Sequence, residues 1–162
     1  MKRRRAREYA LQLLFGMDFI NTPGWEHAKA SPEEKSRIRN GLDLFWKEAS
    51  EEDPDIKAFT EDLVFGTVGR LEEIDSVIQE VAEKWKLSRI ACVDRNIMRF
   101  AAYELLYRGD IPDAVSINEA LEIAKKYSSA EASSFINGIL DKIAKEYKQK
   151  KTQAHISGSE SK

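Results

Sequence analysis

Residues 88–107 read SRIACVDRNIMRFAAYELLY, and this stretch decides the fold. Its apolar side chains recur at helical spacing, at Ile90, Val93, Ile97, Phe100, Ala101 and Leu105. Such spacing is typical of an amphipathic helix, whereas a half-buried strand would alternate apolar and polar residues. Because this is the longest and most apolar of the periodic segments, we expect its helix to lie at the centre of the core.

Six other segments of the chain show the same helical spacing. They are expected at about 4–20, 32–47, 56–68 and 71–85 before the central segment, and from about 116 and about 130 after it. The serines before three of them, Ser31, Ser116 and Ser128, are typical of helix N-caps, and Glu119 and Glu131 would complete capping boxes. No segment reads as a strand. We therefore predict an all-α, single-domain bundle of about seven helices.

The last predicted helix sets the domain boundary. We place the helical domain at 1–148 and expect a disordered tail at 149–162, where the sequence is polar and rich in small residues. Gly138 lies inside this last helix, where a glycine costs up to about 1 kcal/mol relative to alanine. We interpret Gly138 as a point where a neighbouring helix approaches closely.

Composition excludes several classes of protein. The single cysteine, Cys92, cannot form an internal disulfide or a thiolate metal site alone, which fits a reducing cytoplasm. No apolar run approaches the roughly 20 residues that span a bilayer. The basic N-terminus is followed by Glu8 and Gln12, so no signal peptide is expected. We expect a cytoplasmic protein without a membrane segment.

Catalytic and metal-binding patterns are weak. The two histidines, His27 and His155, lie in a polar connection and in the predicted tail, away from any patterned nucleophile. Glu119 and Glu122 are one helical turn apart and could hold a metal, but a cap and a surface ion pair with Lys126 explain them better. We expect no catalytic site, no metal and no cofactor.

The N-terminus carries the strongest functional signal. Lys2, Arg3, Arg4, Arg5 and Arg7 place five cations in seven residues of a chain whose net charge is −2. Positive charge at a helix N-terminus opposes the helix dipole, so the cluster makes local sense if an anion approaches it. The guanidinium fork suits phosphate. The alternative is a solvated basic end without a partner.

Three residues farther along this helix suggest which anion it is. Tyr9, Gln12 and Phe15 follow the arginines, and an aromatic ring beside arginines can stack on an unpaired RNA base. Packing in the core or at the helix edge is the alternative for each, and for Phe15 we favour the core.

Several motifs in order resemble the NusB family of bacterial transcription antitermination factors. They are Arg5-Ala6-Arg7-Glu8-Tyr9-Ala10-Leu11-Gln12, Asp94-Arg95-Asn96-Ile97-Met98-Arg99, Tyr103-Glu104-Leu105, Ile111-Pro112, Ile117-Asn118-Glu119-Ala120, Ala124-Lys125 and Phe135-Ile136-Asn137-Gly138-Ile139-Leu140-Asp141. The motifs cover about 1–20 and 56–145. Residues 21–55 are longer than the usual connection in the family and match nothing in it.

The resemblance implies a non-enzymatic all-α factor. NusB-like factors bind the single-stranded boxA element of nascent ribosomal RNA leaders together with a small-subunit ribosomal protein, NusE. Their complex joins RNA polymerase and suppresses premature termination.

The resemblance also implies site residues. It implies RNA contacts at Arg3, Arg4, Arg5, Arg7, Gln12, Phe15, Glu131 and Phe135, and a partner contact at Asp94. Core packing for Phe135, helix capping for Glu131 and a surface pair between Asp94 and Arg95 remain alternatives.

Two other functions compete with this interpretation. One is a purely protein-binding helical adaptor whose basic end is incidental. The other is the NusB-like domain attached to some ribosomal RNA methyltransferases, which would need a nucleotide-binding domain that we do not expect in this sequence.

Overall fold

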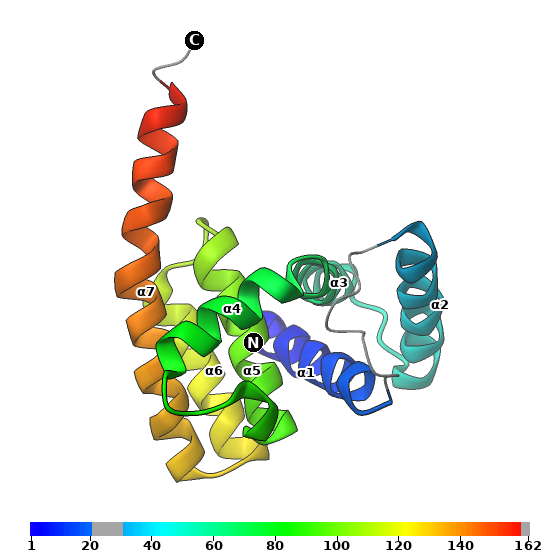
Figure 1. The fold of residues 1–162 in the computed structure, drawn as a ribbon. Coiled ribbons are helices and arrows are strands. Elements are labelled where there is room, and N and C mark those ends of the chain that lie inside the picture. Colours follow the sequence, from blue (N-terminus) through cyan, green and yellow to red (C-terminus); the bar gives the residue numbers. More distant parts are fainter. Residues whose placement is uncertain (21–30, 160–162) are drawn as a thin grey trace.

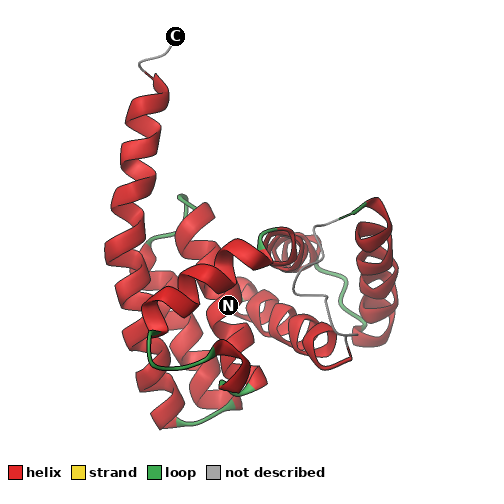
Figure 2. Cartoon of the chain, in the orientation of Figure 1, coloured by secondary structure: helices red, strands yellow, loops and turns green. Residues whose placement is uncertain are grey.

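Residues 1–20 and 31–159 are described by a computed structural model, with side chains described at 1–18 and 31–147. Helices occupy most of these residues and no strand occurs among them (Figures 1 and 2). Their bounds are α1 Lys2–Ile20, α2 Pro32–Ala49, α3 Pro54–Gly69, α4 Leu71–Ala82, the 3-10 turn η2 Leu87–Arg89, α5 Cys92–Tyr107, α6 Asp113–Tyr127 and α7 Ala130–Ser159. The prediction of an all-α bundle of about seven helices is confirmed. Across these described ranges, no helix has the length and apolarity needed to cross a membrane.

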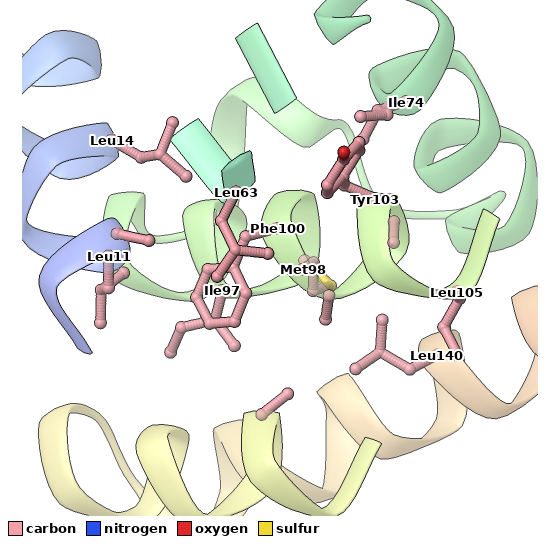
Figure 3. Packing of buried hydrophobic residues seen from close by; sticks show 14 of the residues in the cluster. Leu11, Leu14, Leu63, Ile74, Ile97, Met98, Phe100, Tyr103, Leu105 and Leu140 are labelled. Carbon is pink, nitrogen blue, oxygen red and sulfur yellow. The ribbon is translucent and has the colours of Figure 1, made fainter. Parts of the chain in front are cut away.

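Helix α5 lies at the centre of the bundle, as its apolar pattern predicts. It packs against α1, α3, α4, α6 and α7. Ile97, Met98 and Phe100 are completely buried, and Figure 3 shows them between Leu11 of α1 and Leu140 of α7. Burial of each such side chain stabilises the fold by roughly 1.5–3 kcal/mol. Helix α5 therefore joins segments that are far apart in the sequence.

The prediction that this helix is the longest is wrong, and so is its predicted start. Helix α5 has 16 residues and α7 has 30. Helix α5 begins at Cys92 because the preceding residues form η2 and an extended connection. The guanidinium of Arg95 donates to the carbonyl oxygens of Leu87, at 3.3 Å, and Ile90, at 3.1 Å. These bonds hold the connection outside the helix.

Helix α2 lies beside α1 and α3 at one end of the molecule (Figure 1). Its start follows the predicted N-cap, since Ser31 Oγ accepts a hydrogen bond from the Glu34 amide at 3.2 Å. Trp46 is buried and meets the Tyr9 ring of α1 edge-on, with 5.4 Å between ring centroids. Trp46 also donates to the Glu61 carboxylate of α3 at 3.0 Å. Helix α2, in the segment where sequence analysis found no family motif, thus packs on α1 through an aromatic contact.

The capping box predicted at Ser116 and Glu119 is wrong. Helix α6 begins three residues earlier, at Asp113, so Ser116 lies within its first turn. The buried Ser116 hydroxyl donates to the Glu104 carboxylate at 3.0 Å, and Glu119 binds Arg4. Ser116 and Glu119 thus join α6 to α5 and to α1, and a local sequence pattern does not predict such contacts between helices. At the next helix the cap is Ser129 rather than Ser128, since Ser129 Oγ accepts from the Ala132 amide at 3.0 Å.

Helix α7 continues to Ser159, past residue 148. The hydroxyl of Tyr147 donates to Glu80 of α4, so α7 still contacts the bundle next to the predicted domain boundary. The boundary itself stays a prediction. The interpretation of Gly138 is wrong, because a Cβ at this residue would meet nothing within 4 Å. The tightly packed glycine is Gly66, where a Cβ would overlap the Tyr103 ring.

Candidate nucleic-acid interface

The four arginines at the start of α1 point in different directions. Arg7 lies in the interior, with 2% of its side chain exposed. Its Nη2 and Nε donate to the two carboxylate oxygens of Glu104 on α5 at 2.7 and 2.9 Å. Ser116 donates to the same carboxylate, so the buried charge is well supplied with hydrogen bonds. Arg7 therefore joins α1 to α5 and offers no solvent-facing group to a ligand.

Arg4 stays partly exposed but is held in one orientation. Its Nε and Nη2 donate to Glu119 of α6 at 2.7 and 2.9 Å, and 39% of its side chain is exposed. The hydrogen bonds and charge of Glu119 raise the pKa of Arg4, and Arg4 lowers the pKa of Glu119. Arg4 is thus a fixed cation whose Nη1 donates no hydrogen bond to Glu119.

Arg5 lies on the other flank of the same exposed face. Its Nε is 2.9 Å from Glu51 and 3.1 Å from the hydroxyl of Tyr9, while 59% of the side chain is exposed. The Glu51 carboxylate also accepts hydrogen bonds from the Asp53 amide and, at 3.0 Å, from the Tyr9 hydroxyl. The connection between α2 and α3 therefore orients Arg5 and leaves it accessible.

The exposed face of α1 continues toward its C-terminal half. Arg4, Glu8, Gln12 and Phe15 are spaced by three or four residues, which places them on one side of a helix. Gln12 is exposed and Phe15 is half-buried. The structure thus brings Arg4, Gln12 and Phe15 onto one face, as the RNA hypothesis requires.

The end of α6 extends this face, and sequence reasoning missed it. Lys126 Nζ lies 3.1 Å from Glu8 and 5.2 Å from the centroid of the Tyr127 ring. Tyr127 is 41% exposed, and its hydroxyl donates to Glu8 at 3.3 Å. The signal in the sequence is the run Lys125-Lys126-Tyr127 at the end of a predicted helix, since the apolar stripe of that helix does not need the tyrosine. We call Arg4, Arg5, Gln12, Lys126 and Tyr127 the α1–α6 face.

Arg3 lies on the opposite side of the α1 N-terminus. Its guanidinium lies over the Phe59 ring of α3, 5.0 Å from the centroid, and Arg108 lies 5.3 Å from the same centroid. These residues line a cleft of about 540 Å³ with Lys2, Asp55, Ala58 and Asp62. The structure does not bring Arg3 together with Arg4 and Arg5.

The two predicted RNA contacts on α7 have different surroundings. Glu131 is exposed in the first turn of the helix. Phe135 is half-buried, packs against the core and meets the Trp85 ring edge-on at a centroid distance of 6.0 Å. Sequence reasoning missed Trp85, which is 60% exposed.

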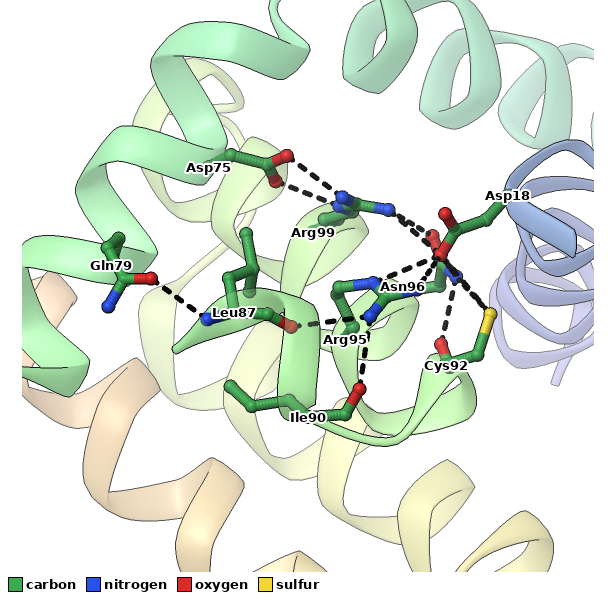
Figure 4. A network of polar contacts seen from close by, with 9 residues as sticks. All are labelled: Asp18, Asp75, Gln79, Leu87, Ile90, Cys92, Arg95, Asn96 and Arg99. Atoms are coloured by element: carbon green, nitrogen blue, oxygen red, sulfur yellow. Dashed lines mark hydrogen bonds and ion pairs between the residues drawn. The ribbon is translucent and has the colours of Figure 1, made fainter. Parts of the chain in front are cut away.

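Asp94 lies in the first turn of α5 without a hydrogen bond to its buried Oδ1 within the described residues. The alternative of a surface pair with Arg95 is wrong, because Arg95 Nη2 binds Asp18 of α1 at 2.7 Å. Figure 4 shows Asp18 at the centre of a network with Cys92, Asn96 and Arg99 as well. This network fixes the C-terminal half of α1 to α5.

Glu119 and Glu122, which the sequence analysis considered as metal ligands, form ion pairs in the structure. Glu119 binds Arg4, and Glu122 lies 3.2 Å from Lys125. The predicted pair of Glu122 with Lys126 is wrong, because Lys126 binds Glu8. In the described ranges, no group of three or more His, Cys, Asp or Glu side chains could hold a metal ion. The geometry favours ion pairing over metal binding for Glu119 and Glu122.

Comparison with known proteins gives the family. The family model named NusB matches residues 4–145. The chain belongs to the NusB family. The transcription antitermination protein NusB of Thermodesulfovibrio yellowstonii is 48% identical over 148 residues, which cover 90% of this chain and 93% of that protein. NusB of Bacillus pumilus is 42% identical over 92% of this chain and 99% of its own length.

Solved NusB structures share the fold. NusB of T. maritima superposes with a TM-score of 0.70 at 36% identity, covering 90% of this chain and 92% of that one. A NusB chain from a complex of the antitermination factors NusB and NusE with double-stranded RNA gives a TM-score of 0.71 at 26% identity, covering 90% and 98%. This NusB-family chain is a transcription antitermination factor and not an enzyme.

Proposed function

We propose that this chain binds a boxA-like single-stranded RNA in the leader of nascent ribosomal RNA, together with a NusE-like ribosomal protein. The α1–α6 face supports this most directly, because it combines oriented, accessible cations with an exposed aromatic ring. That combination suits the phosphates and unstacked bases of a single strand. The similar NusB chain solved with NusE and double-stranded RNA supports the choice of RNA and of a NusE-like protein as ligands. In the cytoplasm, the assembled complex then joins RNA polymerase and suppresses premature termination.

The roles of the site residues follow from their exposure. Arg4 and Arg5 bind phosphate, and Gln12 and Phe15 contact the strand farther along α1. Arg7 supports this surface from within, since its guanidinium is buried against Glu104. Phosphate contacts supply affinity without sequence information, so base choice falls to the side chains beside them.

The first turn of α5 is the proposed contact for the NusE-like protein. A buried carboxylate oxygen without a donor costs roughly 1–3 kcal/mol, or more when it is charged. Asp94 Oδ1 is such an atom, so a partner N–H or cation at this turn would offset that cost. Asp94→Asn should weaken binding of the NusE-like protein in the absence of RNA.

Titration with a boxA-like RNA, with and without the ribosomal protein, tests the proposal. We expect tighter RNA binding when the protein partner is present, since two sets of contacts on one ligand reinforce each other. Arg4→Ala with Arg5→Ala should weaken binding and reduce the slope of log affinity against log salt by roughly 0.7 for each phosphate that is no longer neutralised. Lys35→Ala with Lys145→Ala removes two exposed cations outside the α1–α6 face, so it is the matched control and should change neither the affinity nor the slope. Failure to bind RNA at low salt under both conditions would favour the protein-binding adaptor.

A further inference from the structure

Trp85 is a large aromatic side chain left in solvent. It lies in the connection between α4 and α5, and 60% of it is exposed. Tryptophan is highly buried on average, because its ring contributes much apolar surface. The exposed part of this ring is apolar surface that a ligand can cover with a gain in free energy.

The connection that carries Trp85 is held firmly. The side-chain amide of Gln79 donates to the Trp85 carbonyl and accepts from the Leu87 amide, both at 2.8 Å. Figure 4 shows the second of these bonds, and it shows Arg95 bound to the carbonyl oxygens of Leu87 and Ile90. Two side chains from flanking helices thus fix the backbone from the Trp85 carbonyl to Ile90. The exposed position of Trp85 is preorganised.

The backbone conformation two residues before Trp85 also indicates a preorganised segment. Glu83 has a φ of 38°, which is unfavourable for a residue with a Cβ. Such conformations persist where surrounding structure enforces them, and they cluster at ligand-binding segments. The turn at Glu83 directs the chain away from α4 and toward the exposed segment.

Two lysines flank the ring in the sequence. Lys84 and Lys86 are exposed, and neither binds a carboxylate within the described part of the chain. At the N-terminus, by contrast, Lys2, Arg4 and Arg5 each bind a carboxylate from another element. The charge of Lys84 and Lys86 is therefore available to an anion without breaking an existing ion pair.

We propose that Trp85 stacks on an unpaired base of a bound RNA strand while Lys84 and Lys86 bind its neighbouring phosphates. The inference rests on the proposed function and extends the RNA contact to a second element. Trp85 meets Phe135 edge-on at 6.0 Å, so the two rings form one aromatic surface beside α7. An aromatic ring between unpaired lysines suits single-stranded nucleic acid, whereas a protein hot spot is normally enclosed by apolar contacts.

RNA titration of the full chain tests this site with four variants. Trp85→Ala should weaken binding of the boxA-like RNA by about fivefold to a hundredfold, the range expected for one stacked base. Trp85→Phe keeps a ring and should recover most of that affinity. Lys84→Ala with Lys86→Ala should lower the salt slope by roughly 1.4. Lys35→Ala with Lys145→Ala removes two exposed cations of α2 and α7 and should leave the slope unchanged.

Tryptophan fluorescence gives an independent readout of stacking. RNA should quench the wild-type emission, and Trp85→Phe should lose this quenching although it still binds. Urea unfolding of each variant separates loss of binding from loss of structure, and all four should unfold close to the wild type.

The outcomes distinguish this site from the proposed function. If RNA affinity depends on Arg4 and Arg5 but not on Trp85, Lys84 or Lys86, the inference is overturned and the proposed function stands. If RNA affinity depends on Trp85 but not on Arg4 and Arg5, the result would support the Trp85 site and exclude the α1–α6 face as an RNA contact. If Trp85→Ala weakens only binding of the ribosomal protein without RNA, the surface is a protein contact and the inference fails. Absence of RNA binding by the wild type overturns both.

Discussion

Arg7 of α1 and Glu104 of α5 form a two-bond ion pair, at 2.7 and 2.9 Å, in the interior of the bundle. No more than 2% of either side chain is exposed. A buried pair of this kind contributes little over an apolar pair of similar volume, but removal of one partner leaves an uncompensated charge. The pair therefore sets the orientation of α1, and with it the direction of the exposed arginines.

Arg7→Ala should lower the free energy of unfolding by about 3–5 kcal/mol, because Glu104 would stay buried without its counter-ion. Chemical denaturation followed by circular dichroism measures this loss. Arg4→Ala is the matched control, and its partly exposed pair should cost about 1 kcal/mol or less. Equal unfolding midpoints for the two variants would contradict the structural role of Arg7.

The positions of these two arginines show what a local pattern can predict. Apolar periodicity predicts the helices, the central place of the helix expected at 88–107 and the fold class, because burial of an apolar stripe depends on spacing within one helix. It does not predict that Arg7 faces inward, because its partner Glu104 lies 97 residues away. The unfavourable charge at the α1 N-terminus is offset by acidic side chains of other elements, such as Glu119 and Glu51.

Asp18 should make the stability depend on pH. Burial raises the pKa of this carboxyl. Hydrogen bonds from Arg95, Cys92 and Asn96 and the charge of Arg99 lower the pKa by more than burial raises it, so it lies below the ordinary value of an aspartate. A carboxyl with a lowered pKa in the folded state stabilises the protein above its unfolded pKa, and this contribution is lost as pH falls through the lower folded value.

Asp18→Asn should therefore be less stable than the wild type at pH 7, and the difference should shrink as the pH falls from 7 to below about 4, the ordinary pKa of an aspartate. Urea midpoints measured across this range give both curves. Other ionised carboxyls contribute equally to wild type and variant, so the difference isolates Asp18. A difference that stays constant with pH would exclude the assigned ionisation.

Gly66 and Gly138 should respond in opposite ways to the same substitution. Gly66→Ala places a methyl group inside the Tyr103 ring and should destabilise the protein by about 1–3 kcal/mol. Gly138→Ala meets open space within a helix and should stabilise it by up to about 1 kcal/mol. Thermal unfolding of the two variants measures the contrast, and a loss of stability in Gly138→Ala would show that a neighbour does approach this residue.

Site residues were harder to predict than the fold. The sequence pattern indicates Arg4, Arg5 and Gln12 because they cluster on one predicted helix. Lys126 and Trp85 belong to other elements, and only packing brings Lys126 beside Glu8 and Trp85 beside Phe135. A linear motif cannot report such proximity, since it depends on how helices cross.

Arg4→Lys separates the charge of Arg4 from its geometry. Glu119 holds the guanidinium by two hydrogen bonds, at 2.7 and 2.9 Å, which a single ammonium group cannot reproduce. If Arg4 binds phosphate as proposed, Arg4→Lys should keep the salt slope of RNA binding but lose about tenfold in affinity, because the cation is no longer held in place. Arg4→Ala should lose affinity and also flatten the slope by roughly 0.7. Identical slopes in all three proteins would mean that Arg4 does not neutralise a phosphate, and equal affinities for Arg4→Lys and the wild type would mean that Glu119 does not position it.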